Sequence, residues 1–580
     1  MIKRRSYLLL LLLAGFCVAQ ETKKIGPLTV TMTQLSGINP GSMGYQTIQF
    51  KVVNGDQKPH ELSIVLGHLF RMENQIERVV KSLNIEAGNE AVVKLRTWRQ
   101  VTSPTQVTFS LDGRRIDETF EIPFGPRNAR PYMLVFHFNI LTDKQAPTIN
   151  PALIRFLDST AADVLSGTIN PSDLKQLLWE EAKPVALWGD HWLDYSPYDL
   201  VQLTGEQWRK LSALQKKALT TWLQCGGTLF IHESDRASLP MEWQLPPGQM
   251  VNPHLGLGHL LIRPENEPFS QAEVAELMTR LIETKSGRWN FLHMPDLNID
   301  FQVAEDLALP LKSLFLLLMV FSLIIGPANY LYLARKNRRV WMMVTIPAIA
   351  ISATLAVASY AMIKEMGTSC VRRESFVFLN ELEHRAVIKE KVGIYSPTSL
   401  KPPQFNADTL VGSTVNLRNR LTLDWTNGQT LKGGWISARE PFFYQTTRNE
   451  IRRERLAIEK KGSDFMVANH LGAPVEILHF TDENGHIYKA ENVAVGQTVK
   501  AVDMDRVAKP ESMDLYKFLE LDWRVEHKAD NYFCREEPNL CLEANRYLAI
   551  LSGSPFEAIT HEARTEHHKT LVYGVWEVQQ

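Results

Sequence analysis

The sequence predicts a multidomain membrane protein: an N-terminal β-sandwich, a doubly wound α/β domain, a two-helix transmembrane hairpin and a C-terminal β-rich, sandwich-like domain. Three observations lead to this fold class. Two long uncharged apolar runs occupy residues 313–334 and 340–363, short strand-like segments precede and follow them, and strand and helix patterns alternate within residues 130–285. The formal net charge of the 580 residues is −1, so no electrostatic field draws the chain to nucleic acid and no such partner is expected.

The amino terminus has the three parts of a secretory signal peptide. Lys3, Arg4 and Arg5 form its basic region, residues 7–16 its apolar core, and residues 17–19 a cleavage site of small residues. We therefore expect residues 1–19 to be removed. The alternative, a lipidated Cys17, would require a small residue in place of Phe16.

Residues 25–125 predict a β-sandwich of immunoglobulin or fibronectin type. Several of its strand-like segments alternate apolar and polar residues, and Asn-Gly, Asn-Pro and Asp-Gly turns separate them. The segments are 28–33, 47–54, 61–67, 91–98 and 105–113. No constellation of ligand-binding residues stands out here, so a recognition or spacer module is expected.

Residues 130–285 predict an α/β domain with a parallel sheet, because strands alternate with a helix. The expected strands are 131–140, 184–190, 198–205 and 228–232, and an amphipathic helix occupies 206–224 before Gly226 and Gly227. Ligands of open α/β sheets bind at the carboxyl ends of strands. The candidate cleft residues at these ends are His137, Asp190, His191, His232, Glu233 and Ser234.

Serine, histidine and carboxylate together could in principle support acyl transfer. Ser234, however, lacks the glycine-flanked turn that would expose a nucleophile. We therefore predict no catalytic residue, no metal and no cofactor, and leave open a cleft that only binds a ligand.

The two apolar runs predict a transmembrane hairpin, because each exceeds the ~20 residues needed to cross a bilayer. The loop 335–339 carries Arg335, Lys336, Arg338 and Arg339, which places it in the cytoplasm and both flanks outside. Gly326, Pro327 and Pro347 are expected to kink the helices. Neither run contains an Asp, Glu, Lys, Arg or His residue that could carry ions or protons. The alternative is a pair of buried core helices.

Residues 370–580 predict an exported β-rich domain. Cys534 and Cys541 are expected to form a local disulfide, since a zinc site would need a second ligand pair. Cys225 and Cys370 are expected to remain thiols. The charged segment 446–464 suggests a solvated helix or an exposed strand edge. A final cluster suggests a solvated polar loop rather than a metal site: His561, Glu562, Glu566, His567 and His568.

Several quoted segments resemble one family. They are YDLVQLTG at 198–205, LTTWLQCGGTLFIH at 219–232, GLGHLLI at 256–262 and GPANYLYLARKNRR at 326–339. Together they resemble bacterial two-span membrane proteins that carry a class I glutamine-amidotransferase-like (flavodoxin-like) exported domain. Active amidotransferases carry a cysteine on a tight strand-to-helix turn. Cys225 precedes its strand and no GxCxG element occurs, so the resemblance implies the fold without that activity.

These observations predict a non-enzymatic protein of the bacterial inner membrane, with two passes and both large domains on the periplasmic side. Its expected partners are the lipid bilayer and an envelope protein, which it would bind or scaffold. Two alternatives remain open. One is a hydrolase or transferase that uses the α/β cleft, and the other is an accessory subunit of a membrane transport complex.

Overall fold

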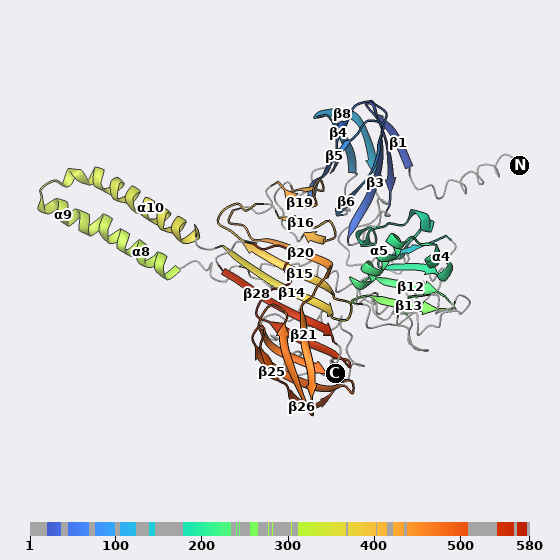
Figure 1. The fold of residues 1–580 in the computed structure, drawn as a ribbon. Coiled ribbons are helices and arrows are strands. Elements are labelled where there is room, and N and C mark those ends of the chain that lie inside the picture. The colour runs from blue at the N-terminus through green and yellow to red at the C-terminus, as the bar shows by residue number, and fades with distance from the viewer. Residues whose placement is uncertain are drawn as a thin grey trace, which may run out of the picture.

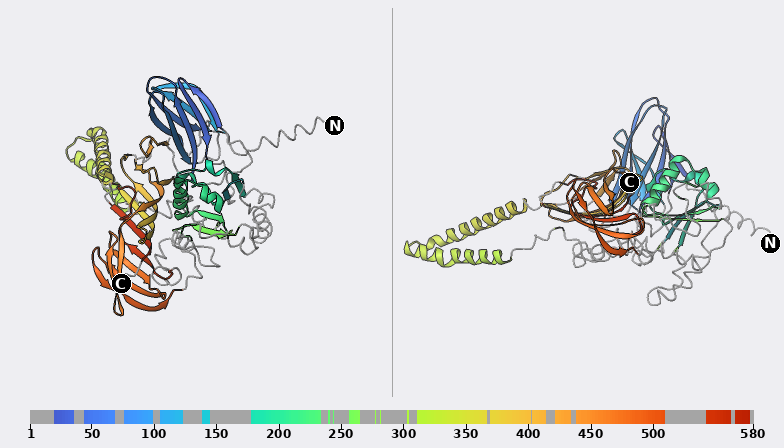
Figure 2. Two further views of the ribbon diagram at one scale, coloured as in Figure 1. Left: turned by 45° about the vertical axis from the view of Figure 1, so that its right-hand side comes forward. Right: turned by 60° about the horizontal axis from the view of Figure 1, so that its bottom comes forward.

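A computed structural model describes most of the chain, and Figures 1 and 2 show it as ribbons. The described residues are 20–35, 44–68, 76–98, 105–122, 138–144, 178–233, 239–240, 243, 256–264, 277, 281, 303, 311–366, 369–401, 403–413, 421–433, 438–508, 542–561 and 565–576. The predicted signal peptide (1–19), His137, Ser234, Cys534 and Cys541 lie outside them.

The structure is multidomain and rich in β-sheet, as the sequence predicts. Two sheets form the N-terminal sandwich, and Phe50, Phe109 and Phe120 meet edge-to-face between them. The four-stranded sheet has the order β1(Gln20–Ile25), β2(Leu28–Gln34), β3(Tyr45–Asn54) and β6(Glu90–Trp98). The seven-stranded sheet has the order β16(Gln404–Phe405), β19(Gln429–Lys432), β18(Leu421–Asp424), β5(Ile76–Ile85), β4(His60–His68), β7(Thr105–Leu111) and β8(Arg114–Ile122).

Three strands of this seven-stranded sheet, β16, β18 and β19, follow the helical hairpin in the sequence. β18 pairs in parallel with β5, with Leu421 opposite Ile76 and Asp424 opposite Val80. The backbone N–H of Trp425 continues the pairing by donating to the Val80 carbonyl at 2.8 Å. The sequence assigned these strands to a separate domain. In the structure they complete the N-terminal sandwich (Figure 1).

The α/β block contains a five-stranded, fully parallel sheet. Its order is β10(Leu178–Ala182), β9(Phe138–Thr142), β11(Leu200–Thr204), β12(Thr228–His232) and β13(His259–Arg263). The helix expected at 206–224 is two helices, α4(Gly205–Lys210) and α5(Ala213–Gln224). The division follows from Ser212, whose hydroxyl accepts from the Gln215 N–H and so begins a new helix with a capping box.

The prediction of a strand at residues 184–190 is wrong. That segment is a loop with a short 3-10 turn, η1(Val185–Leu187), and a second such turn, η2(Trp192–Asp194), follows it. Val185 and Trp188 are buried, with Trp188 packed against Tyr195, while Leu187 is 38% exposed. A short apolar run therefore did not distinguish a loop from a strand.

The C-terminal block pairs a nine-stranded sheet with a three-stranded one over a common apolar core. The larger sheet has the order β17(Leu410–Ser413), β20(Phe442–Ile451), β15(Arg385–Tyr395), β14(Cys370–Asn380), β28(Thr565–Val575), β27(Arg546–Leu551), β23(Val475–Thr481), β24(His486–Val493) and β26(Val502–Val507). The smaller has β21(Arg455–Lys461), β22(Asp464–His470) and β25(Thr498–Lys500).

Two expectations for this block need correction. The charged segment 446–464 begins in β20, an interior strand, where Arg448 is buried and pairs with the buried Glu390 at 2.9 Å. The prediction failed because a paired charge can be buried where an unpaired one cannot. Only β21 is largely exposed, as expected. His567 and His568 lie in strand β28 rather than in a polar loop.

The hairpin extends away from the other blocks (Figures 1 and 2). It consists of α8(Leu311–Leu323), η6(Ile324–Ala328), α9(Asn329–Arg335), η7(Arg339–Trp341) and α10(Met342–Met366). Phe315–Arg335 and Arg339–Ser359 are long and apolar enough to cross a membrane. The irregularity predicted at Gly326-Pro327 is a π-helical turn, η6, because proline has no N–H for a helical bond. α10 continues through Pro347.

A partly buried carboxyl ties the two sheets of the C-terminal block together. Glu381, in the turn after β14, accepts hydrogen bonds from the Leu456 N–H at 2.9 Å and the Tyr547 hydroxyl at 2.8 Å. Burial outweighs these bonds and raises the pKa of Glu381 from 4.5 to about 7. The protonated form therefore favours folding, and this contribution is complete below pH 4.5 and lost as pH rises through 7.

We predict that Glu381→Gln removes part of the pH dependence of stability. In the native chain this group should lower the free energy of unfolding by up to about 3 kcal/mol as pH rises from 4.5 to above 7. Glutamine keeps the accepting oxygen without the charge, so the variant should be more stable than the native chain above pH 7. Denaturant unfolding of the full chain across this pH range measures the free energy of unfolding. Glu476→Gln, at an exposed position of β23, is the control. Parallel pH profiles for all three proteins would contradict the prediction.

Candidate functional site

The predicted cleft at the carboxyl edge of the parallel sheet contains His232 and Glu233. His232 is 3% exposed, and the Gln202 amide donates to its Nε2 at 2.8 Å. Burial, and to a lesser degree the charge of Arg263, lowers the pKa of His232 to about 4, so its ring is neutral near pH 7. A neutral, hydrogen-bonded histidine in this position serves the packing of the sheet.

The carboxylate of Glu233 likewise has a polar partner and close packing contacts. Its Oε2 pairs with Arg209 Nη1 at 2.6 Å, and it packs against Gly205 so closely that any side chain there would collide with the carboxylate. In the adjoining helix α4, the ring of Trp208 packs at a tilt of 44° against the fully buried Trp243, with 4.7 Å between ring centroids. The chain's own residues therefore fill this part of the edge.

Asp190 and His191 do not join His232 and Glu233. They lie in the loop before β11, where Asp190 pairs with Lys94 of β6 and His191 Nε2 contacts Asp408 Oδ1 at 2.6 Å. This loop packs on the end of α5, where Tyr195 contacts Trp222. That end of α5 comes just before the start of β12, whereas His232 and Glu233 are at the end of β12. The structure thus separates the predicted residues into two groups.

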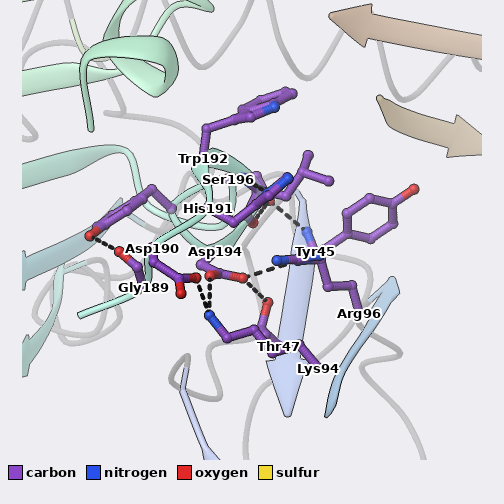
Figure 3. A network of polar contacts seen from close by, with 12 residues as sticks. Tyr45, Thr47, Lys94, Arg96, Gly189, Asp190, His191, Trp192, Asp194 and Ser196 are labelled. Atoms are coloured by element: carbon purple, nitrogen blue, oxygen red, sulfur yellow. Dashed lines mark hydrogen bonds and ion pairs between the residues drawn. The ribbon is translucent and has the colours of Figure 1, made fainter. Parts of the chain in front are cut away.

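The loop that holds Asp190 and His191 takes part in a polar network at a block boundary, shown in Figure 3. We call it the Asp194 junction: Tyr45, Thr47, Lys94, Arg96, Asp194 and Ser196. Asp194 is 4% exposed, and its carboxylate accepts from Arg96 Nε at 3.0 Å and Thr47 Oγ1 at 3.0 Å. Burial alone would raise its pKa, but Arg96 and Lys94 outweigh burial and hold the pKa below its ordinary value.

Close backbone packing holds the junction in place. The Ser196 hydroxyl donates to the Leu193 carbonyl at 2.7 Å and accepts from the Tyr45 N–H at 2.8 Å. Gly44 has φ of +120° and lies so near Ser196 that an added Cβ would be 2.5 Å from its backbone. Gly189 would meet Asp194 in the same way, at 2.4 Å. Only glycine fits at both positions.

The segment after the hairpin completes the junction. The Tyr45 hydroxyl donates to Gln429 Oε1 at 2.7 Å and accepts from the Val411 N–H at 3.1 Å. The Trp425 indole donates to the Arg96 carbonyl at 2.8 Å. Burial raises the pKa of Tyr45, so it stays a neutral donor. Three blocks of the chain therefore meet at one buried set of hydrogen bonds.

Sequence reasoning missed this junction. Asp194 was not singled out, because its partners Arg96 and Thr47 are 98 and 147 positions away and no local spacing connects them. The arrangement has no nucleophile beside a base. Among the described residues no group of three or more His, Cys, Asp or Glu side chains is suited to hold a metal ion. Its chemistry is that of an interdomain contact.

The remaining candidates also have structural partners. His561 Nε2 and the Tyr444 hydroxyl are 2.8 Å apart, and burial lowers the pKa of His561 to about 4. His568 Nε2 pairs with Glu566 Oε2 at 2.8 Å on β28, while Glu562 lies outside the described residues. Cys225 and Cys370 are buried thiols, as expected.

No protein-family model matches the chain, and no curated protein matches it. Solved structures give only distant likenesses. A cycloisomaltooligosaccharide glucanotransferase of Paenibacillus sp. is 12% identical, with TM-score 0.15 over 36% of this chain and 28% of that one. A Bacteroides uniformis β-glucuronidase 2 is 11% identical, with TM-score 0.16 over 37% and 33%. An Amycolatopsis orientalis exo-chitosanase, CsxA, is 10% identical, with TM-score 0.18 over 95% and 64%.

The chain spans less than two thirds of the length of each of these three proteins. At such TM-scores the likenesses carry no argument about the fold or the activity of this chain.

We predict that Asp194→Asn lowers the free energy of unfolding by about 3 kcal/mol or more, because it leaves the buried Arg96 without a counter-charge. The matched control is Asp190→Asn, which removes the exposed partner of Lys94 and should cost less than about 1 kcal/mol. Denaturant unfolding of the full chain, with limited proteolysis, measures both. Equal losses in the two variants would show that Asp194 does not hold the blocks together.

Proposed function

We propose that this chain is a non-enzymatic, membrane-anchored scaffold of the bacterial envelope, with its folded blocks on the periplasmic side of the inner membrane. One observation carries the proposal: the parallel pairing of β18 with β5, which joins residues on both sides of the hairpin in a single sheet. A protein built in this way presents one body to its partners rather than two independently tethered domains.

The shared sheet supports the proposed topology. Strands that pair with each other must lie on the same side of a membrane, so the two flanks of the hairpin must be together. A hairpin whose ends are on one side has its turn on the other, and that turn contains four Arg and Lys residues. The positive-inside rule places such a turn in the cytoplasm. The predicted amino-terminal signal peptide would export the flanks in the same direction.

The described contacts at the carboxyl edge of the parallel sheet support a structural role for the residues that make them. The side chains of His232 and Glu233 are held by Gln202 and Arg209. We propose that the α/β block is an amidotransferase-like (flavodoxin-like) domain that has kept the fold as a structural part. In this proposal its loop before β11 serves to connect the blocks through the Asp194 junction.

The topology can be tested with alkaline phosphatase fused to the chain at three positions. Fusions after Asn290 and Leu400 should be active, because both positions flank the hairpin on the exported side. A fusion at Asn337, in the turn, should be inactive. Activity at Asn337, or inactivity at either flank, would contradict the proposed arrangement.

The scaffold role can be tested by site-specific photocrosslinking in cells. The probes replace exposed residues on the N-terminal and C-terminal blocks: Val92, Leu382 and Val502, which are 56%, 55% and 67% exposed. The matched control is Val344 on the hairpin, which is 61% exposed. Protein adducts from the exported positions, with only lipid adducts from Val344, are expected. Adducts to a polytopic protein from Val344 alone would favour the accessory-subunit alternative instead.

A further inference from the structure

The turn of the hairpin is an ordered structure that concentrates positive charge. α9 ends at Arg335, and the chain reverses through two backbone bonds, from Asn337 N–H to the Ala334 carbonyl at 3.1 Å and from Arg338 N–H to the Leu333 carbonyl at 3.0 Å. Asn337 has φ of +55°, a left-handed conformation that asparagine tolerates better than most residues. Four cations therefore fall within five residues at a tight turn.

Two of these cations lie on aromatic rings of α9. Lys336 Nζ is 4.8 Å from the centre of the Tyr332 ring, and Arg339 Cζ is 5.9 Å from that of Tyr330. Both rings are exposed on the outer surface of the hairpin, at 59% and 44%. Tyrosine rings favour the head-group level of a bilayer, so these contacts would hold the charges at that depth.

A hydrogen bond between the helices fixes the spacing of the turn. Asn329 Nδ2 donates to Thr345 Oγ1 at 2.9 Å, which joins α9 to α10 about two turns below the tip. In an apolar environment such a polar contact between helices is favoured, because neither group has water to bind. The charged side chains of the turn are therefore presented from a defined frame and not from a loose loop.

No carboxylate among the described residues supplies a counter-charge to this turn. The single acidic residue between 311 and 366 is Glu365, which lies at the opposite end of α10. Among the residues that the structure describes, Arg335, Lys336, Arg338 and Arg339 make no ion pair with a carboxylate.

We propose that the hairpin turn is a binding site for anionic phospholipid head groups, with Lys336, Arg338 and Arg339 contacting the lipid phosphate. The proposal rests on the membrane anchoring proposed above. A lipid fits better than a free phosphate, because Val340 and Trp341 beside the cations are 80% and 57% exposed and would contact the acyl and glycerol region.

The test uses the full chain in nanodiscs made from an equimolar mixture of phosphatidylglycerol and phosphatidylcholine, with native mass spectrometry of the lipids that stay bound. The native chain should retain phosphatidylglycerol in preference. Replacing Lys336, Arg338 or Arg339 by glutamine should lower that preference by up to about fivefold for each charge removed, as expected for one charge at an anionic surface. The test variants are K336Q, R338Q and R339Q, singly and together. The control is K312Q with K364Q, which removes two charges at the other end of the hairpin.

Each outcome decides the proposal. Loss of the preference in the triple variant, with the control unchanged, supports the site at the turn. Equal retention of both lipids by the native chain, or an equal loss in the control, overturns it while leaving the membrane anchor intact. Displacement of the lipid by glycerol phosphate alone would assign the site to a free phosphate and overturn the lipid proposal. A native chain that does not enter nanodiscs at all would overturn the anchoring itself.

Discussion

The parallel pairing of β18 with β5 is the contact on which the rest of this structure depends. Strands separated by more than 300 residues, with the α/β block and the hairpin between them, complete one sheet. The chain crosses repeatedly between sheets after the hairpin, since β16, β18 and β19 belong to the N-terminal sandwich while β17 and β20 belong to the C-terminal sheet. The two blocks are thereby joined by strand pairing as well as by side chains.

Buried charges make this joining specific. Arg96 and Asp194 are acceptable inside the protein only when they meet, because a buried charge without its partner costs several kcal/mol. The C-terminal block follows the same rule, where Glu390 lies between Arg373 at 3.1 Å and Arg448 at 2.9 Å. Each network draws its charges from different strands or blocks. A misplaced block would therefore leave a buried charge unpaired, which disfavours alternative arrangements.

The sequence predicted what depends on local pattern. The hairpin followed from two apolar runs, and strands β2, β3, β4, β6 and β7 and the parallel strands β11 and β12 followed from periodicity, whereas β5 and β8 were not predicted. The rest depends on contacts distant in sequence. Nothing near residue 421 indicates that β18 pairs with β5, and Arg448 looked solvated because its partner Glu390 is on another strand. The predicted site residues fall into two groups for the same reason. The order of the predicted strands grouped Asp190 with His232, but the ion pair with Lys94 of the sandwich determines where Asp190 lies.

The central claim is that both flanks of the hairpin form one sheet, and a cross-strand disulfide tests it most directly. Val79 and Leu423 are paired across β5 and β18, so Val79→Cys with Leu423→Cys should form a disulfide in the exported protein. After cleavage at a protease site introduced at Ser286, the two fragments should stay covalently linked until a reductant is added. Val92→Cys with Leu423→Cys, which pairs an exposed residue of β6 with the same strand, should give separate fragments. Separation of the fragments in the Val79 and Leu423 variant, without reductant, would contradict the shared sheet.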